Sequence, residues 1–86
     1  MSETRETRIK RMRMRSWRRG IKEMDLILGG FSDSGLSNLS DAELETYDLI
    51  LEENDHDLYF WCSGQGPAPE EFSDLLQRIM AESKVV

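Results

Sequence analysis

Histidine and cysteine, the side chains that most often act as nucleophiles, bases or zinc ligands, each occur once in this sequence. They are His56 and Cys62, six residues apart. On a helix this spacing places two side chains about 120° apart around the axis, so the two do not form a nucleophile–base pair or the start of a zinc site. We therefore expect no catalytic residue and no metal ligand, with His56 at a solvated helix start and Cys62 in the core.

Acidic residues and glycines offer two other kinds of binding chemistry. The acidic segment 52–57, Glu-Glu-Asn-Asp-His-Asp, lacks the glycine and the distal bidentate glutamate of a calcium loop. We interpret it as a solvated junction between helices. Gly29-Gly30 and Gly64-x-Gly66 follow no predicted strand and precede no Lys-Ser/Thr, so they are not phosphate loops and we expect turn glycines.

Recognition chemistry remains, and its candidate is segment 19–23, Arg-Gly-Ile-Lys-Glu. Ile21 begins the apolar stripe of the following helix, so Glu23 should face outward. Arg19 and Glu23 are four residues apart and can then meet on one exposed face. Gly20 has no side chain and lets another backbone or a flat ligand approach closely. The residues alone leave open whether this is a binding surface or an ordinary helix junction with a surface ion pair.

Apolar residues that recur every three or four positions predict the helices that hold this junction. The predicted helices cover 4–18, a segment from Ile21 that stops near Gly29-Gly30, a segment that Ser40 and Glu43 open as a capping box, a segment from Asn54 or Asp55 to Gly64, and a segment from Pro69 to Glu82. Gly20 offers a place to end or bend the first helix. No segment alternates like a strand, so the fold class is all-α, a compact bundle of about five short helices.

The size and charge of the chain favour binding over catalysis. Its 86 residues make one domain, 1–86, with a basic arm at 1–10 and a frayed tail at 83–86. Residues 1–22 carry nine Lys or Arg against two Glu, whereas residues 23–86 carry two against fifteen Asp or Glu. Such an arm binds a polyanion, binds an acidic protein, or folds back on its own acidic half.

The cellular location is predicted from what the sequence lacks. It has no apolar run of membrane-spanning length and one cysteine only, which favours a reducing compartment and no membrane insertion. Glu3 and Glu6 argue against reading the arginine-rich start as a mitochondrial presequence. We expect a cytoplasmic protein.

The motifs, taken in order, resemble one known family. They are Arg19-Gly20-x-x-Glu23 followed by Met24-Asp25, Leu39-Ser40-Asp41-x-Glu43, Tyr47 to Glu52, and Asp57-Leu58-Tyr59-x-Trp61. In this order they resemble the small FAD assembly factors of succinate dehydrogenase, over roughly Arg11 to Trp61. Trp17 is larger than the family pattern leads us to expect, and the arm is richer in arginine.

The resemblance implies an assembly factor, or chaperone, rather than an enzyme. It implies binding to the flavoprotein subunit of succinate dehydrogenase, and to that of fumarate reductase, with promotion of covalent FAD attachment to a histidine there. It implies that no cofactor is stably bound and that FAD is handled on the partner. The partner-binding residues would be Arg19, Gly20 and Glu23, with Arg15 and Lys22 beside them.

A second patch is formed by Asp57, Tyr59 and Trp61, which we expect to brace the fourth helix against the core. Two other functions remain open. The basic segment 5–22 favours a nucleic-acid-binding module, although the acidic body and a pI of about 4.7 argue against it. The other alternative is a protein-interaction domain with no flavin connection.

Overall fold

The computed structural model describes residues 3–83, so the first two residues of the predicted arm and the last three of the predicted tail lie outside the described residues. The described elements are α1 (Arg5–Ser16), α2 (Lys22–Ser34), the 3-10 helix η1 (Leu36–Asn38), α3 (Asp41–Leu51), α4 (Asp55–Cys62) and α5 (Glu70–Glu82). Residues 3–83 contain no strand. The all-α class and the five-helix bundle are confirmed, and η1 was not predicted.

Side-chain caps fix where three of these helices begin. The Thr4 hydroxyl accepts a hydrogen bond from the Thr7 amide at 3.1 Å and caps α1. Ser40 and Glu43 form the predicted capping box of α3, at 3.1 and 2.8 Å. Asn54, one of the two predicted caps of α4, accepts from the His56 amide at 2.8 Å. These side chains satisfy amides that have no partner inside the helix.

The turn between α1 and α2 differs from the prediction. The first helix ends at Ser16, because Trp17 is already extended, with φ −97° and ψ 161°. Arg18 then takes the left-handed conformation, with φ 62°. Gly64 is the glycine in residues 3–83 with a positive φ. Gly20 is therefore not needed for a left-handed turn, and Arg18 makes that turn instead.

The prediction that the second helix stops at Gly29-Gly30 is wrong, since α2 continues to Ser34. Gly29 is needed for a reason that the local sequence does not show. The Trp17 ring lies against it, and a Cβ on Gly29 would come within 2.4 Å of the ring atom Cδ2. The glycine therefore allows close packing between α2 and the turn after α1, and does not make a turn itself.

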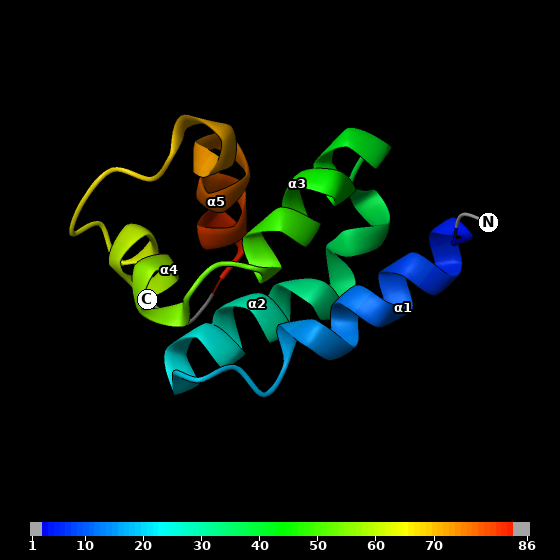
Figure 1. The fold of residues 1–86 in the computed structure, drawn as a ribbon, viewed down its shortest axis with the longest axis horizontal. Helices are drawn as coiled ribbons and strands as arrows, with labels where there is room; N and C mark the ends of the chain where they lie inside the picture. The colour runs from blue at the N-terminus through cyan, green and yellow to red at the C-terminus, as the bar shows by residue number, and fades with distance from the viewer. Residues whose placement is uncertain (1–2, 84–86) are drawn as a thin grey trace.

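The core lies between two layers of helices. In Figure 1, α1 and α2 run antiparallel side by side, α3 runs alongside α1 in the same direction, and α5 crosses these helices with α4 at one end. Tyr47 of α3 is fully buried at the centre, where its ring stacks on Phe31 at 6.0 Å between centroids. Its hydroxyl bonds Ser16 at 2.6 Å and the Leu28 carbonyl at 3.2 Å. Burial raises the pKa of Tyr47 to about 12.

Candidate functional site

The Arg19-Gly20 junction is bound to the start of α4 by one carboxylate, that of Asp55. Arg19 Nε donates to Asp55 Oδ1 at 2.7 Å, and the Gly20 amide donates to Asp55 Oδ2 at 2.7 Å. Both side chains are largely buried, with 9% of Arg19 and 18% of Asp55 exposed. Asp55 thus uses both oxygens to hold two consecutive residues, and charge-assisted bonds of this kind are the stronger ones.

The other nitrogens of Arg19 bind the ends of two helices. Nη1 donates to the Arg15 carbonyl in the last turn of α1, and to the Leu51 carbonyl at the end of α3, each at 3.2 Å. Nη2 donates to the Glu53 carbonyl at 3.3 Å. Carbonyls at helix C-termini lack partners and carry partial negative charge, so a cation stabilises them. Arg19 therefore joins α1, α3 and α4 at one point.

The predicted contact between Arg19 and Glu23 is wrong. Arg19 lies before the helix, which begins at Lys22, so the four-residue helical spacing does not apply to it. Its amide instead donates to Asp25 Oδ1 at 3.0 Å, and its side chain turns inward to Asp55.

The outer side of the junction consists of Gly20, Lys22 and Glu23, all exposed. Within residues 3–83, neither Lys22 nor Glu23 makes an ion pair. A Cβ on Gly20 would lie 3.1 Å from Asp55 Oδ2. A side chain at Gly20 would therefore press on the carboxylate and also cover the backbone that a partner could approach.

Arg15, the remaining predicted partner-binding residue, points away from the outer side of the junction and toward α3. It pairs with Glu52 at 2.6 Å and lies 3.7 Å from Asp48. We call the row of pairs between the first and third helices the α1–α3 seam; its pairs are Arg5–Asp41, Arg11–Asp48 and Arg15–Glu52. The seam shows that the basic helix folds back on the acidic half, one of the three predicted outcomes.

The second predicted patch divides into packed and exposed residues. Tyr59 and Trp61 pack against the core, and the Trp61 ring lies 6.2 Å from that of Phe72, centroid to centroid. These two side chains brace α4 as expected. Asp57 is exposed in the first turn of α4 and does not share that packing.

His56 and Cys62, the two residues with the side chains most suited to catalysis, have no role in the Arg19-Gly20 junction. His56 is exposed and Cys62 is partly buried. Burial raises the pKa of the Cys62 thiol to about 11, so the thiol is protonated at neutral pH and a poor nucleophile. No cluster of three His, Cys, Asp or Glu within residues 3–83 has the geometry to hold a metal ion.

Sequence reasoning missed two residues of this site. Asp55 was considered only as a helix cap, because nothing in linear spacing joins it to Arg19, 36 positions away. Arg18 was placed inside the predicted helix 4–18, because a positive φ is uncommon for arginine and no local signal indicated a turn there. Only the three-dimensional structure shows that Asp55, at the start of α4, faces Arg19 in the turn between α1 and α2.

The fold and the site define a small all-α domain with an arginine–glycine turn locked between three helices. The chain belongs to the family described as flavinator of succinate dehydrogenase, whose model matches residues 10–83. It is 42% identical over 72 residues to "Succinate dehydrogenase assembly factor 2, mitochondrial" of Mycosarcoma maydis, covering 84% of this chain and 30% of the relative. Proteins of the same name from Meyerozyma guilliermondii and Schizosaccharomyces pombe are 41% and 39% identical, covering 84% and 81% of this chain.

The chain spans 30%, 56% and 50% of the length of these three relatives. Their names also overturn one prediction. All three are named mitochondrial, so the expected cytoplasmic location is contradicted. That expectation depended on acidic residues near the first position of the sequence, and such residues say nothing of where the relatives work. Among residues 3–83, no helix is long and apolar enough to cross a membrane.

Proposed function

We propose that this chain binds the flavoprotein subunit of succinate dehydrogenase and promotes covalent attachment of FAD to a histidine there. Membership of the flavinator family and similarity to proteins named succinate dehydrogenase assembly factor 2 support this function. The observation that carries it is the Arg19-Gly20 junction, where Asp55 fixes the turn and leaves Gly20 and Glu23 facing outward.

In this proposal the flavin bond forms on the partner, and the chain holds no FAD of its own. The donors at the junction support this division. The side chain of Arg19 and the amide of Gly20 could otherwise bind a phosphate, but they already donate to Asp55 and to carbonyl oxygens. A site whose donors are used within the fold binds an anionic cofactor weakly.

The chain would act by orientation. Binding would favour the flavoprotein conformation in which the flavin and its acceptor histidine are aligned, which lowers the entropic part of the barrier. Gly20 would allow close approach, and the free carboxylate of Glu23 would accept hydrogen bonds from partner donors. Arg19 would act from inside, by holding the turn. The flavoprotein subunit of fumarate reductase would be a second partner, bound and flavinylated in the same way.

Co-expression of the succinate dehydrogenase flavoprotein with and without this chain tests the function, with covalent flavin read as fluorescence in a denaturing gel. Glu23→Ala should lower the covalent flavin at least fivefold. Glu71→Ala is the matched control, because Glu71 is also the second residue of its helix and exposed. It should change nothing.

Gly20→Arg should also lower the covalent flavin, with helical content retained by circular dichroism. Equal covalent flavin with and without the wild-type chain would reject the function. Equal losses in Glu23→Ala and Glu71→Ala would reject the assignment of the junction as the site.

A further inference from the structure

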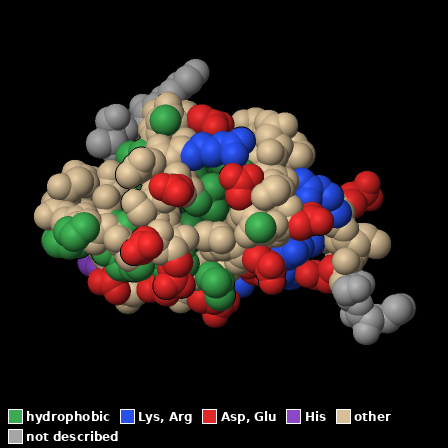
Figure 2. Space-filling view, turned by 90° about the horizontal axis from the view of Figure 1, so that it is seen from above, with side chains coloured by type: hydrophobic (Ala, Val, Ile, Leu, Met, Phe, Trp, Pro, Cys, Tyr) green, Lys and Arg blue, Asp and Glu red, His purple; other side chains and the backbone are tan. Residues whose placement is uncertain are grey.

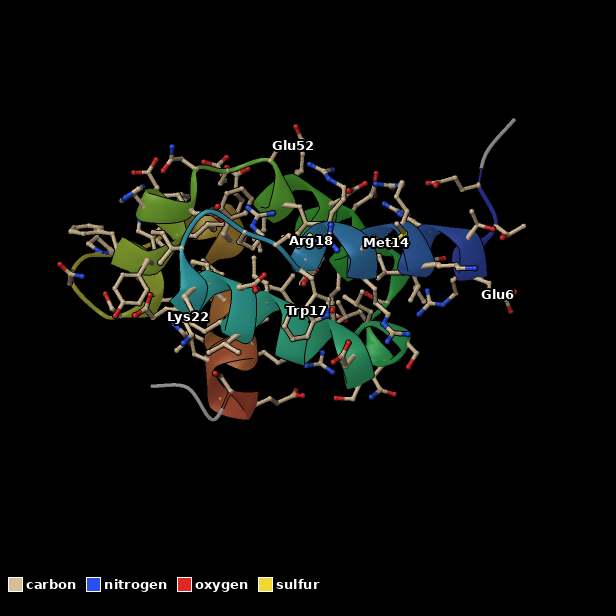
Figure 3. The ribbon with its side chains drawn as sticks, turned by 90° about the horizontal axis from the view of Figure 1, so that it is seen from below. Glu6, Met14, Trp17, Arg18, Lys22 and Glu52 are labelled. Atoms are coloured by element: carbon tan, nitrogen blue, oxygen red, sulfur yellow. The ribbon has the colours of Figure 1, made fainter. Side chains whose placement is uncertain are left out.

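The helix α1 has two unlike sides. The side toward α3 carries the seam, where each arginine meets a carboxylate. The opposite side faces the viewer in Figure 3, beside the start of α2. Together with the turn after α1 and the start of α2, this side forms what we call the Met14 surface, which consists of Lys10, Arg13, Met14, Trp17, Arg18, Lys22 and Leu26.

The apolar part of the Met14 surface is exposed and continuous. Met14 is 73% exposed and Leu26 is 42% exposed. Trp17 joins them, because it lines a hollow of about 270 Å³ with Met14 and another of about 310 Å³ with Leu26. The Trp17 ring is held in place by Gly29 and by its Nε1, which donates to Asp33 at 3.2 Å. The surface is therefore preformed.

Within residues 3–83, three of the four cations of the Met14 surface are unpaired, and the fourth, Arg13, pairs with Asp33 at 3.3 Å. Lys10, Arg18 and Lys22 make no ion pair with any residue of 3–83, whereas six arginines of the same range do. Arg8, the remaining cation of that range, lies on the seam side and helps to lower the pKa of Asp48. On the face shown in Figure 2, basic side chains lie among acidic ones. On a chain of net charge −6, the unpaired positive charge gathers on one surface.

Arg18 adds a conformational observation. A left-handed backbone is unfavourable for a residue with a Cβ, yet the exposed side chain of Arg18 makes no ion pair within residues 3–83. Its neighbours Trp17 and Arg19 both turn toward the protein. The turn therefore separates two packed side chains from one that points outward.

We propose that the Met14 surface is a docking site for a protein surface with an apolar centre and a rim of carboxylates, carried by the flavoprotein client. This inference depends on the proposed function and extends the contact well beyond Gly20 and Glu23. The unpaired charges of Lys10, Arg18 and Lys22 complement carboxylates on the partner, and the exposed side chain of Met14 complements its apolar centre. Nucleic acid fits less well, because three cations neutralise few phosphates and the rest of the molecule is acidic.

The test measures the dissociation constant of the purified chain for the purified succinate dehydrogenase flavoprotein, by titration calorimetry at 50 and 300 mM NaCl. Met14→Glu and Lys10→Glu should each weaken binding about tenfold at 50 mM NaCl. The loss in Lys10→Glu should shrink at 300 mM, because salt screens charges at the rim. Leu49→Glu is the matched control for Met14→Glu, because both substitutions add one negative charge and Leu49 is 53% exposed on α3, away from this surface. It should stay within twofold of wild type.

Three results decide the inference. Wild-type affinity in Met14→Glu and Lys10→Glu, with flavinylation still dependent on the chain, would overturn the docking surface and leave the proposed function standing. No binding and no flavinylation by the wild-type chain would reject both. Binding of duplex DNA or of anionic vesicles by the wild-type chain, lost in the same two variants, would overturn the assignment to a protein partner.

Discussion

The α1–α3 seam and the Arg19 junction both pair arginine with carboxylates, but the seam pairs are exposed and the junction pair is largely buried. In the seam, each arginine meets one or two carboxylates, Arg5 also donates to the carbonyls of Ser37 and Leu39, and the arginines are 36% to 43% exposed. At the junction, one arginine that is 9% exposed meets a carboxylate and three carbonyls. Exposed ion pairs contribute little because water screens them, whereas a buried charge is costly to leave without partners. The junction, not the more numerous seam pairs, should fix the geometry of the site.

Loss of the junction carboxylate should have the largest effect. Asp55→Ala leaves Arg19 Nε and the Gly20 amide without their acceptor and the buried guanidinium without its counter-charge, which should lower the free energy of unfolding by about 2–3 kcal/mol. Asp41→Ala, which removes the seam partner of Arg5, is the control and should cost about 1 kcal/mol or less. Urea denaturation followed by circular dichroism measures both. Equal losses would mean that burial does not distinguish the two regions.

Exchange of arginine for lysine separates geometry from charge. Arg19→Lys keeps the positive charge but loses the planar fork that reaches several acceptors, and should cost about 1–2 kcal/mol. Arg15→Lys in the seam should cost under about 0.5 kcal/mol, because its pair with Glu52 needs charge more than shape. The melting temperatures of the two variants test this. A larger loss in Arg15→Lys would contradict it.

Acid should weaken the seam. The hydrogen bond from Arg11 holds the pKa of Asp48 below its usual value. A carboxyl whose pKa is lowered in the folded state stabilises the fold above the unfolded pKa and loses that contribution as the pH falls through the folded pKa. Stability should therefore decline below about pH 4. In Asp48→Asn the free energy of unfolding should decline less between pH 5 and 2 than in wild type, by a difference on the order of 1 kcal/mol or less. An equal decline in the two proteins would contradict this.

Salt should give the smallest effect. At 1 M NaCl, screening should remove most of the seam contribution, a few tenths of a kcal/mol for each pair. The penalty of Asp55→Ala should persist at 1 M NaCl, because it arises from desolvated groups without partners. The penalty of Asp48→Asn should nearly vanish there. Urea denaturation at 0.1 and 1 M NaCl compares them.

Much of the fold was predictable because it depends on local signals. The capping box at Ser40 and the apolar stripe of α5 lie within single helices and were confirmed. Gly29 was misread, because its neighbour Trp17 comes from the turn after α1, 12 positions away in the sequence. Arg19 was placed on the wrong side, because Asp55 lies far along the chain. Glu23 was correctly predicted to face outward from helical spacing alone. Contacts between elements were what the sequence did not reveal.

We expect Arg19 to act on the site from inside the fold and Glu23 to act from its surface. The decisive measurement is of melting temperature and covalent flavin, on Glu23→Ala and Arg19→Lys under the same conditions. Glu23→Ala should lose flavinylation with a melting temperature within about 2 °C of wild type, whereas the melting temperature of Arg19→Lys should fall by roughly 4–16 °C. Full flavinylation in Glu23→Ala, or a fall in its melting temperature as large as that of Arg19→Lys, would contradict the account.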